Sequence, residues 1–401
     1  MFKFTDVQKV NLIALLGLGA VFLAFGIVVV PGMDYHDKDF FTFWLAGWMS
    51  WAGQSPYDPG QWLSGHIRFG TGWMPNPFFP YPLALGILFI PIGLIPLMQA
   101  YIFWVFLSGL MIAVSVFLLN PGLDLRAWKN LLFPLFAAIL LFRPTIISAY
   151  HGQISGFLLL IPALAVNLWE KGKWWQGGVA LSLLFLKPTL GFPVIAFAGI
   201  WLLFQKRWNA IAGIAGGAAA WAVIGFLQDP AWIGKFLSSG NRKFLDSFGV
   251  MPNVFGLSGA ACNHSLPCTA AGGVILALGL GLLTLWALWR KKNLSPSWMM
   301  SLVIPASLAI APYIWAYDQL LLVIPLTVTA IRLAKSGAPF LVTALYPFGL
   351  SILSLVFLAI SNSQGYDVFS GLIPVLCLAA VWVQLHRQSQ LPVVYPPLTA
   401  G

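Results

Sequence analysis

The sequence predicts an all-α, polytopic membrane protein with about twelve transmembrane helices. Of its 401 residues, 59% are hydrophobic and only 8% are charged, and the mean hydropathy is +0.86. Soluble domains carry about a quarter charged residues, so soluble enzyme classes are excluded. Trp, Phe and Tyr make up 15% of the chain, which suits the two interfaces of a bilayer. The apolar runs are mostly about 20 residues long, the length of one membrane crossing.

The first apolar run, residues 10–31, follows Lys3 and Lys9 and has no small-residue cleavage site after it. It is therefore expected to be a retained helix rather than a signal peptide. We expect residues 1–401 to form a single integral membrane domain. The further predicted crossings are 81–96, 97–119, 131–148, 153–169, 174–204, 209–228, 269–289, 298–315, 318–334, 339–360 and 369–386.

The run 174–204 is too long for one straight span and too short for two ordinary ones, and Lys187-Pro188 interrupts it. A broken or re-entrant helix would explain this length. Basic residues lie on both sides of the run: Lys171, Lys173, Lys206 and Arg207. Because both sides look cytoplasmic, a single crossing conflicts with the charges, and the topology of 120–208 stays open.

Basic clusters in the C-terminal half alternate with weakly charged stretches. The clusters are Arg290-Lys291-Lys292, Arg332 with Lys335, and Arg387. The positive-inside rule places them in the cytoplasm together with both termini and the tail 388–401. The loops 32–80 and 229–268 are then external. The net charge of +10 is explained by this topology, so no nucleic-acid partner is expected, and a prokaryotic plasma membrane is the predicted location.

The first external loop, 32–80, carries four of the eleven acidic residues: Asp34, Asp37, Asp39 and Asp58. Within it, residues 39–52 place aromatic side chains at helical spacing, which predicts an amphipathic helix in the membrane interface. These aromatics are Phe40, Phe43, Trp44, Trp48 and Trp51. The acids fit two interpretations equally: a solvated loop with an N-cap, or a loop that supplies a catalytic base.

Three ionisable residues lie inside apolar runs: Arg143 in LLFRPTII, Lys187 in LFLKPTLG and Asp318 in IWAYDQLLL. Charges at such positions are costly, which favours a functional role. Two cations and a carboxylate suit a site that binds a lipid-linked phosphate and handles a hydroxyl proton. A structural ion pair between helices, or side chains that reach the interface, would explain them as well. His151 and Gln153, in the turn AYHGQIS, could hydrogen-bond a ligand.

The segment DFFTFWLAGWMSWAGQSPYD resembles the first-loop signature of the family-87 glycosyltransferases. FPYPLALGILFIPIGLIP, HGQISGFLLLIPAL, GGVALSLLFLKPTLGFP and APYIWAYDQLLLVIP follow in the family's order. The resemblance implies a GT-C architecture and an inverting transfer on the outer face, from a polyprenol-phosphate sugar to a lipid or glycan acceptor. Mannose is the sugar it implies first, with arabinose or another pentose or hexose as alternatives, because Tyr317-Asp318 replaces a His that is frequent in the family.

The resemblance aligns Asp39, which directly precedes the aromatic pair, with the general base; Asp34 and Asp37 are the alternatives. Base assistance accelerates such a transfer about 10²–10⁴-fold, and fixed cations stabilise the departing phosphate. Lys187 and Arg143 are the expected phosphate partners. The expected substrate contacts are Asp37, Tyr57, Asp58, His151, Gln153, Tyr317 and Asp318. Asp37 and Asp39 could hold a divalent cation, but no metal and no other cofactor is predicted.

The loop 229–268 is expected to cover the donor site. Residues 231–245 predict a short amphipathic helix with Trp232, Phe236 and Phe244 as membrane anchors, able to order when the lipid phosphate binds. Cys262 and Cys268 are expected to form a disulfide if this loop faces an oxidising compartment.

Two other classes of protein share part of this pattern. A secondary transporter or flippase of a lipid-linked or anionic substrate would also have a broken helix and intramembrane charges. It would not need the long acidic, Trp-rich loop, and the sequence shows no matching halves. A non-catalytic scaffold would leave the three intramembrane charges unexplained.

Overall fold

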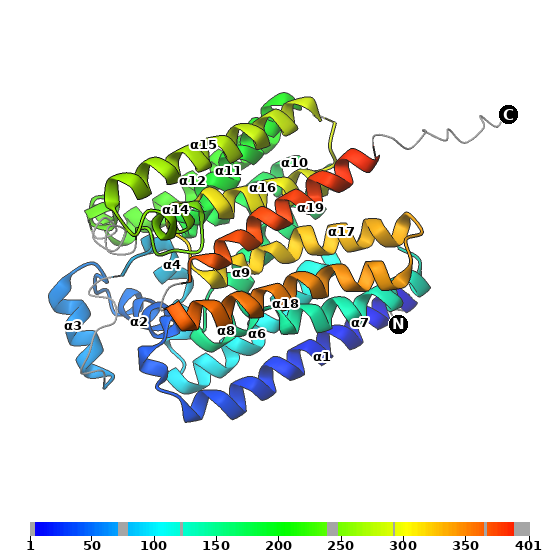
Figure 1. The fold of residues 1–401 in the computed structure, drawn as a ribbon. Helices are drawn as coiled ribbons and strands as arrows, with labels where there is room; N and C mark the ends of the chain where they lie inside the picture. The colour runs from blue at the N-terminus through cyan, green and yellow to red at the C-terminus, as the bar shows by residue number, and fades with distance from the viewer. Residues whose placement is uncertain are drawn as a thin grey trace.

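The computed structural model describes residues 5–70, 79–120, 123–238, 248–291, 293–364 and 367–388, and these residues form helices and turns without any strand. The helices pack as an elongated bundle (Figure 1). The start of α1 and the end of α19 both lie toward the right of the view, with α17 and α18 between them, and we call this side the terminal end. Helices α2, α3 and α14 gather at the opposite side, the loop end.

The elements run in chain order from α1 to α19. The first half comprises α1 (Asp6–Val29), η1 (Val30–Gly32), η2 (Tyr35–Asp37), α2 (Asp39–Trp51), α3 (Pro59–Arg68), α4 (Leu83–Leu88), α5 (Ile90–Gly93), α6 (Leu97–Leu118), α7 (Leu125–Leu141), α8 (Arg143–His151), α9 (Ser155–Glu170), α10 (Trp174–Ser182), η3 (Leu183–Leu186) and α11 (Pro188–Phe204). The second half comprises α12 (Trp208–Gln228), α14 (Val254–Ala261), α15 (Leu266–Arg290), α16 (Pro296–Ile310), η4 (Ala316–Leu322), α17 (Val323–Lys335), α18 (Phe340–Gln364), η5 (Phe369–Gly371) and α19 (Leu372–Gln388).

Among the described residues, seven helices are long and apolar enough to cross a membrane, or eight if the bent pair α7–α8 is one span. Four shorter apolar helices accompany them: 155–170, 174–186, 188–204 and 296–310. The expected count of about twelve crossings is therefore not confirmed. The predicted crossing 81–96 is wrong, because it holds only α4, of six residues, and α5, of four. Pro82, Pro91 and Pro96 break this segment into pieces far shorter than the bilayer.

The run 174–204 is a hairpin that returns to the end from which it starts. The rings of Trp174, at the start of α10, and Trp201, near the end of α11, are 6.4 Å apart. The guanidinium of Arg207 lies 4.2 Å from the centre of the Trp174 ring. The run is therefore interrupted as expected and folds back with Lys187 at the turn, while a re-entrant course in the membrane stays a prediction.

Two further hairpins have the same course. Helix α7 starts beside α1, where the Trp128 indole donates to Asn11 (2.7 Å), and bends by 58° into α8. Helix α9 then returns to the end of α6, where Asn167 donates to the Leu118 carbonyl (2.8 Å). Helix α16 and the η4–α17 segment form the third hairpin, since Arg332 lies 5.9 Å from the Trp298 ring. The turns of the three hairpins, which we call the hairpin tips, thus point away from the terminal end.

Helix α2 packs against α4, α5 and α6, begins beside the turn between α8 and α9, and is largely buried within the protein. Phe40, Phe41 and Phe43 have no exposed surface. A Cβ at Gly47 would overlap the backbone of Phe89, so only glycine lets α2 approach the α4–α5 segment this closely. The expected helix over 39–52 is present as α2, and its expected place in the membrane interface stays a prediction. The aromatic side chains of its first two turns are buried in the protein, whereas Trp51 at its end is 65% exposed.

The second loop also packs on the bundle. Residues 232–238 are helical, and residues 239–245 of the expected helix, with Phe244, lie outside the described residues. Trp232 is buried against the end of α12, where its indole donates to the Ala222 carbonyl (3.3 Å). Its predicted role as a membrane anchor is therefore wrong, because α12 supplies the apolar contact. Cys262 and Cys268 form a disulfide between α14 and α15.

Candidate active site

Asp39 is the first residue of α2, and its carboxylate remains 29% exposed. The side-chain amide of Gln153 donates a hydrogen bond to it at 2.5 Å, and Nδ1 of His151 lies 4.0 Å away. The positive end of the helix dipole stabilises a carboxylate at this position. Asp39 is therefore a hydrogen-bond acceptor that is held on one side and open on the other, as a general base requires.

The turn that carries His151 and Gln153 is fixed against α6. Gly152 has φ +60, a conformation that favours glycine, and a Cβ there would overlap Phe40 and Tyr101. The Tyr101 hydroxyl donates to the Tyr150 carbonyl at 2.7 Å, and the Trp104 indole donates to the Gln153 carbonyl at 3.2 Å. These contacts fix the backbone of the turn, so the side chains of His151 and Gln153 remain available to contact Asp39.

Lys187 and Asp318 form a buried ion pair between two hairpin tips. Their charged atoms are 2.5 Å apart, and their side chains are 4% and 0% exposed. Lys187 ends η3 because the residue before a proline disfavours helical backbone. Asp318 also accepts from the Trp315 backbone N–H (3.0 Å), and the Lys187 ammonium lies 4.9 Å from the Tyr317 ring. Two charges this deeply buried persist only because each neutralises the other.

Three tyrosines connect this pair with Asp39. Tyr81, Tyr313 and Tyr317 each lie within electrostatic reach of both Asp39 and Asp318. Burial raises the pKa of Tyr313 to about 12, and burial together with the charge of Asp39 raises the pKa of Tyr81 well above its usual value. Both phenols therefore stay protonated at neutral pH and can donate hydrogen bonds to a sugar or a phosphate. The Tyr317 ring also lies 6.5 Å from that of His151.

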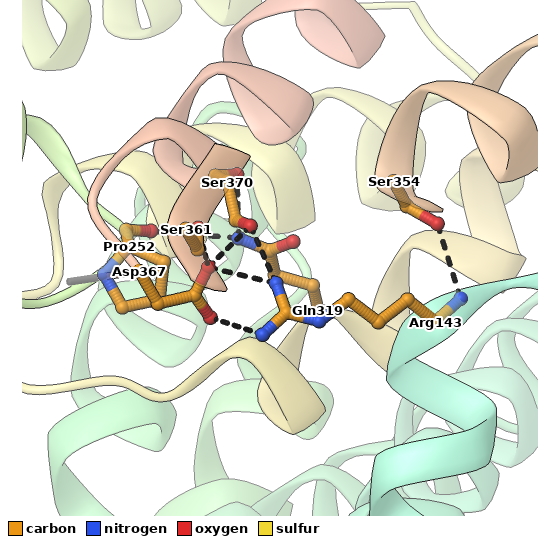
Figure 2. A network of polar contacts seen from close by, with 7 residues as sticks. All are labelled: Arg143, Pro252, Gln319, Ser354, Ser361, Asp367 and Ser370. Atoms are coloured by element: carbon orange, nitrogen blue, oxygen red, sulfur yellow. Dashed lines mark hydrogen bonds and ion pairs between the residues drawn. The ribbon is translucent and has the colours of Figure 1, made fainter. Parts of the chain in front are cut away.

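Arg143 is the centre of a second buried network (Figure 2). Its two terminal nitrogens each donate to one oxygen of Asp367 at 2.7 Å, and one of them also donates to the Ser370 hydroxyl (2.7 Å). Gln319, next to Asp318 in η4, donates to the Ser370 carbonyl (2.8 Å). Because this bidentate pair engages both terminal nitrogens and leaves only the buried Nε without a partner, the geometry favours a positioning role for Arg143 over direct phosphate contact. Its predicted contact with phosphate stays a prediction.

Replacing Arg143 by Met is expected to destabilise the protein by about 3–5 kcal/mol, because Asp367 would keep a partly buried charge without a partner. The double variant Arg143→Met/Asp367→Leu is expected to recover most of that loss. Thermal unfolding in detergent measures both. Lys9→Met, which removes an exposed ion pair with Asp6, is the control and should leave the melting temperature unchanged. A double variant as unstable as Arg143→Met would contradict this account.

The remaining predicted substrate contacts have structural partners. Asp58 caps α3 by accepting from the Gln61 backbone N–H (2.8 Å), and the Tyr57 hydroxyl donates to the Tyr81 carbonyl at 2.5 Å. Asp37 lies 3.8 Å from the Lys38 ammonium. Tyr57 therefore helps to place Tyr81, and contact of these residues with substrate stays a prediction. Within the described part of the chain, no three His, Cys, Asp or Glu side chains come together as metal ligands.

Sequence reasoning missed four residues of this region. Lys38, 4.9 Å from the Tyr150 ring and within electrostatic reach of His151, brings a cation close to Asp39. Tyr81 and Tyr313 lie in segments that carry the family resemblance, but a single Tyr in an apolar context gives no signal of its own. Asp367 is one of only two acids that follow residue 246, the other being Asp318, and this scarcity could have suggested a partner for Arg143.

The chain matches the sequence profile of glycosyltransferase family 87 over residues 78–312, more than half of its length. The matched range contains Tyr81, the turn at His151 and Gln153, and the hairpin tip at Lys187, and it ends one residue before Tyr313. No curated protein and no solved structure matches the chain. The family resemblance seen in the sequence is thereby confirmed, and the chain belongs to glycosyltransferase family 87.

Proposed function

We propose that this membrane glycosyltransferase transfers a sugar from a polyprenol-phosphate donor to a hydroxyl of a lipid or glycan acceptor. Mannose is the sugar that we propose first. The observation that carries this proposal is the partly exposed carboxylate of Asp39, which three phenols connect with the buried Lys187–Asp318 pair. Membership of the family supports the reaction class. The site's arrangement supports the donor class, because a phosphate leaving group needs cations and an acceptor hydroxyl needs a base.

In the proposed reaction, the acceptor oxygen attacks the anomeric carbon of the sugar while Asp39 removes its proton. The bond between the anomeric carbon and the phosphate oxygen breaks, and polyprenyl phosphate leaves with both electrons of that bond. Attack from the face opposite the leaving group inverts the anomeric configuration. Gln153 and His151 hold Asp39 in position for this step.

The negative charge that develops on the leaving phosphate is stabilised by Lys187, with Lys38 as a second cation on the Asp39 side. Lys187 is paired with Asp318 in the structure, so contact with phosphate requires it to exchange one anionic partner for another. The phenols of Tyr81, Tyr313 and Tyr317 supply uncharged donors around the sugar.

We propose that the site opens to the outer face of a prokaryotic plasma membrane, with both termini in the cytoplasm. The loop end carries Asp39 and the Cys262–Cys268 disulfide, and the positive-inside rule supports an external loop end. The residues 229–268 then lie on the face where the donor binds and can order over it.

A membrane-impermeant thiol reagent tests this orientation. In intact cells, Cys262 and Cys268 are expected to react only after reduction of their disulfide, without permeabilisation. Cys377 is buried and should remain unlabelled in both conditions, which makes it an internal control. Labelling of the reduced pair only in permeabilised cells would show that the loop end is cytoplasmic.

The proposed function is tested with purified protein, a lipid extract as acceptor source, and a panel of radiolabelled donors. Polyprenol-phosphate mannose, polyprenol-phosphate arabinose and a nucleotide sugar form the panel. We expect transfer from a polyprenol-phosphate donor only. The anomeric configuration of the sugar in the product should be opposite to its configuration in the donor. Transfer from the nucleotide sugar would contradict the donor class. Movement of the intact donor across proteoliposome membranes without transfer would favour the flippase alternative.

A further inference from the structure

Helices α15 and α19 enclose two adjoining hollows that run toward the terminal end. The outer hollow, of about 340 Å³, is lined by Trp286, Arg290, Lys291, Trp382 and His386 among others. The inner hollow, of about 260 Å³, has an apolar lining that includes Leu280, Leu283, Val375 and Leu378. Both hollows are lined by Trp382 and thus adjoin at this side chain, and we call the two together the α15–α19 groove.

The outer part of this groove is basic. Arg290 lies 5.7 Å and 5.6 Å from the rings of Trp286 and Trp289. No described acidic side chain forms an ion pair with Arg290 or Lys291. The two acids that follow residue 246, Asp318 and Asp367, are instead paired with Lys187 and Arg143. The positive charge of the groove is thus available to an anion from outside the chain.

The dimensions of the groove suit one leaflet of a bilayer. From Leu280 to Lys291 the α15 helix rises about 17 Å, at 1.5 Å per residue. Half of a typical hydrocarbon core is about 15 Å. Trp286 and Trp382 stack across the groove with ring centres 5.6 Å apart, at the boundary between its basic and apolar parts. Tryptophan is enriched at this depth, where the headgroup region meets the acyl chains.

We propose that the α15–α19 groove binds an anionic phospholipid of the membrane. The phosphate lies between Arg290 and Lys291 at the mouth, and an acyl chain lies along the apolar part toward Leu280. Basic pockets between transmembrane helices are typical sites for anionic headgroups. The larger groove of about 590 Å³ between α1 and α7 lacks this charge, because its one basic side chain, Lys129, lies within electrostatic reach of Asp6.

Native mass spectrometry of the purified full chain in detergent tests this proposal, with phosphatidylglycerol and phosphatidylcholine titrated as probes. Wild type is expected to retain phosphatidylglycerol in preference to phosphatidylcholine. Arg290→Gln/Lys291→Gln should weaken phosphatidylglycerol binding on the order of 30-fold, since each surface cation contributes about fivefold in affinity. Phosphatidylcholine binding should change little.

The matched control is Lys206→Gln/Arg207→Gln, a basic pair at the terminal end that also includes an arginine over a tryptophan. It should bind phosphatidylglycerol as wild type does. If both double variants weaken binding equally, the effect is general surface charge and the proposal fails. Ala379→Phe, which fills the apolar part of the groove, tests the site without altering charge and should also reduce binding. Tighter binding of undecaprenyl phosphate than of phosphatidylglycerol at this groove would overturn the choice of ligand.

Discussion

Replacing Asp39 by Asn is expected to reduce transfer by about 10²–10⁴-fold, because an amide of the same shape cannot accept the acceptor's proton. The protein should remain folded, since the substituted amide keeps an oxygen that can accept from Gln153 and the new side chain still begins α2. Single-turnover transfer from a labelled polyprenol-phosphate sugar measures the loss. The melting temperature of the purified variant reports its folding.

The control for this variant is Asp6→Asn, which changes an exposed carboxylate at the start of α1, far along the bundle from the site. It should transfer sugar at the wild-type rate. Near-normal turnover of Asp39→Asn would instead move the base to Asp34, Asp37 or Asp318.

Lys187→Met is expected to lose both stability and transfer, because it leaves Asp318 fully buried and unpaired. Removal of one partner from a buried pair costs about 3–5 kcal/mol of folding free energy. The double variant Lys187→Met/Asp318→Asn should regain most of the stability, since no charge is then left unpaired. The amide oxygen that replaces the Asp318 carboxylate can still accept from the Trp315 backbone N–H.

Transfer by the double variant separates the two roles of Lys187. If Lys187 contacts the donor phosphate, the stable double variant still has a raised donor KM or a lowered kcat, with the acceptor KM little changed. A double variant that is stable and transfers sugar at the wild-type rate would show that the pair is structural only.

The sequence indicated the elements that carry charge inside apolar runs, because such charges are rare and costly. The break at Lys187-Pro188 and the basic residues on both sides of 174–204 left a broken or a re-entrant helix open, and in the structure the run folds back as a hairpin. The helix that follows Asp39 could be predicted from its aromatic spacing. Its environment could not, because an aromatic helical face looks the same whether it contacts lipid or another helix.

The partners of the buried charges lay beyond sequence reasoning. Arg143 and Asp367 are 224 positions apart, and only the packing of α8 against η5 and the end of α18 brings them together. For Lys187 and Asp318, the sequence left both a substrate-binding role and a structural ion pair between helices open, but it could not show that these two residues pair with each other. The predicted crossing at 81–96 failed because average hydropathy does not register the prolines that divide it.

The location of the donor phosphate at the meeting point of the three hairpin tips is the central claim, and photo-crosslinking tests it most directly. A polyprenol-phosphate sugar with a diazirine on the isoprene unit next to the phosphate is bound to the purified protein and irradiated, and the modified peptides are sequenced. Cross-links should fall on the tips around His151, Lys187 and Tyr317 and decrease when unmodified donor competes. Competed cross-links confined to the terminal end, around Arg290 and Lys291, would contradict the account.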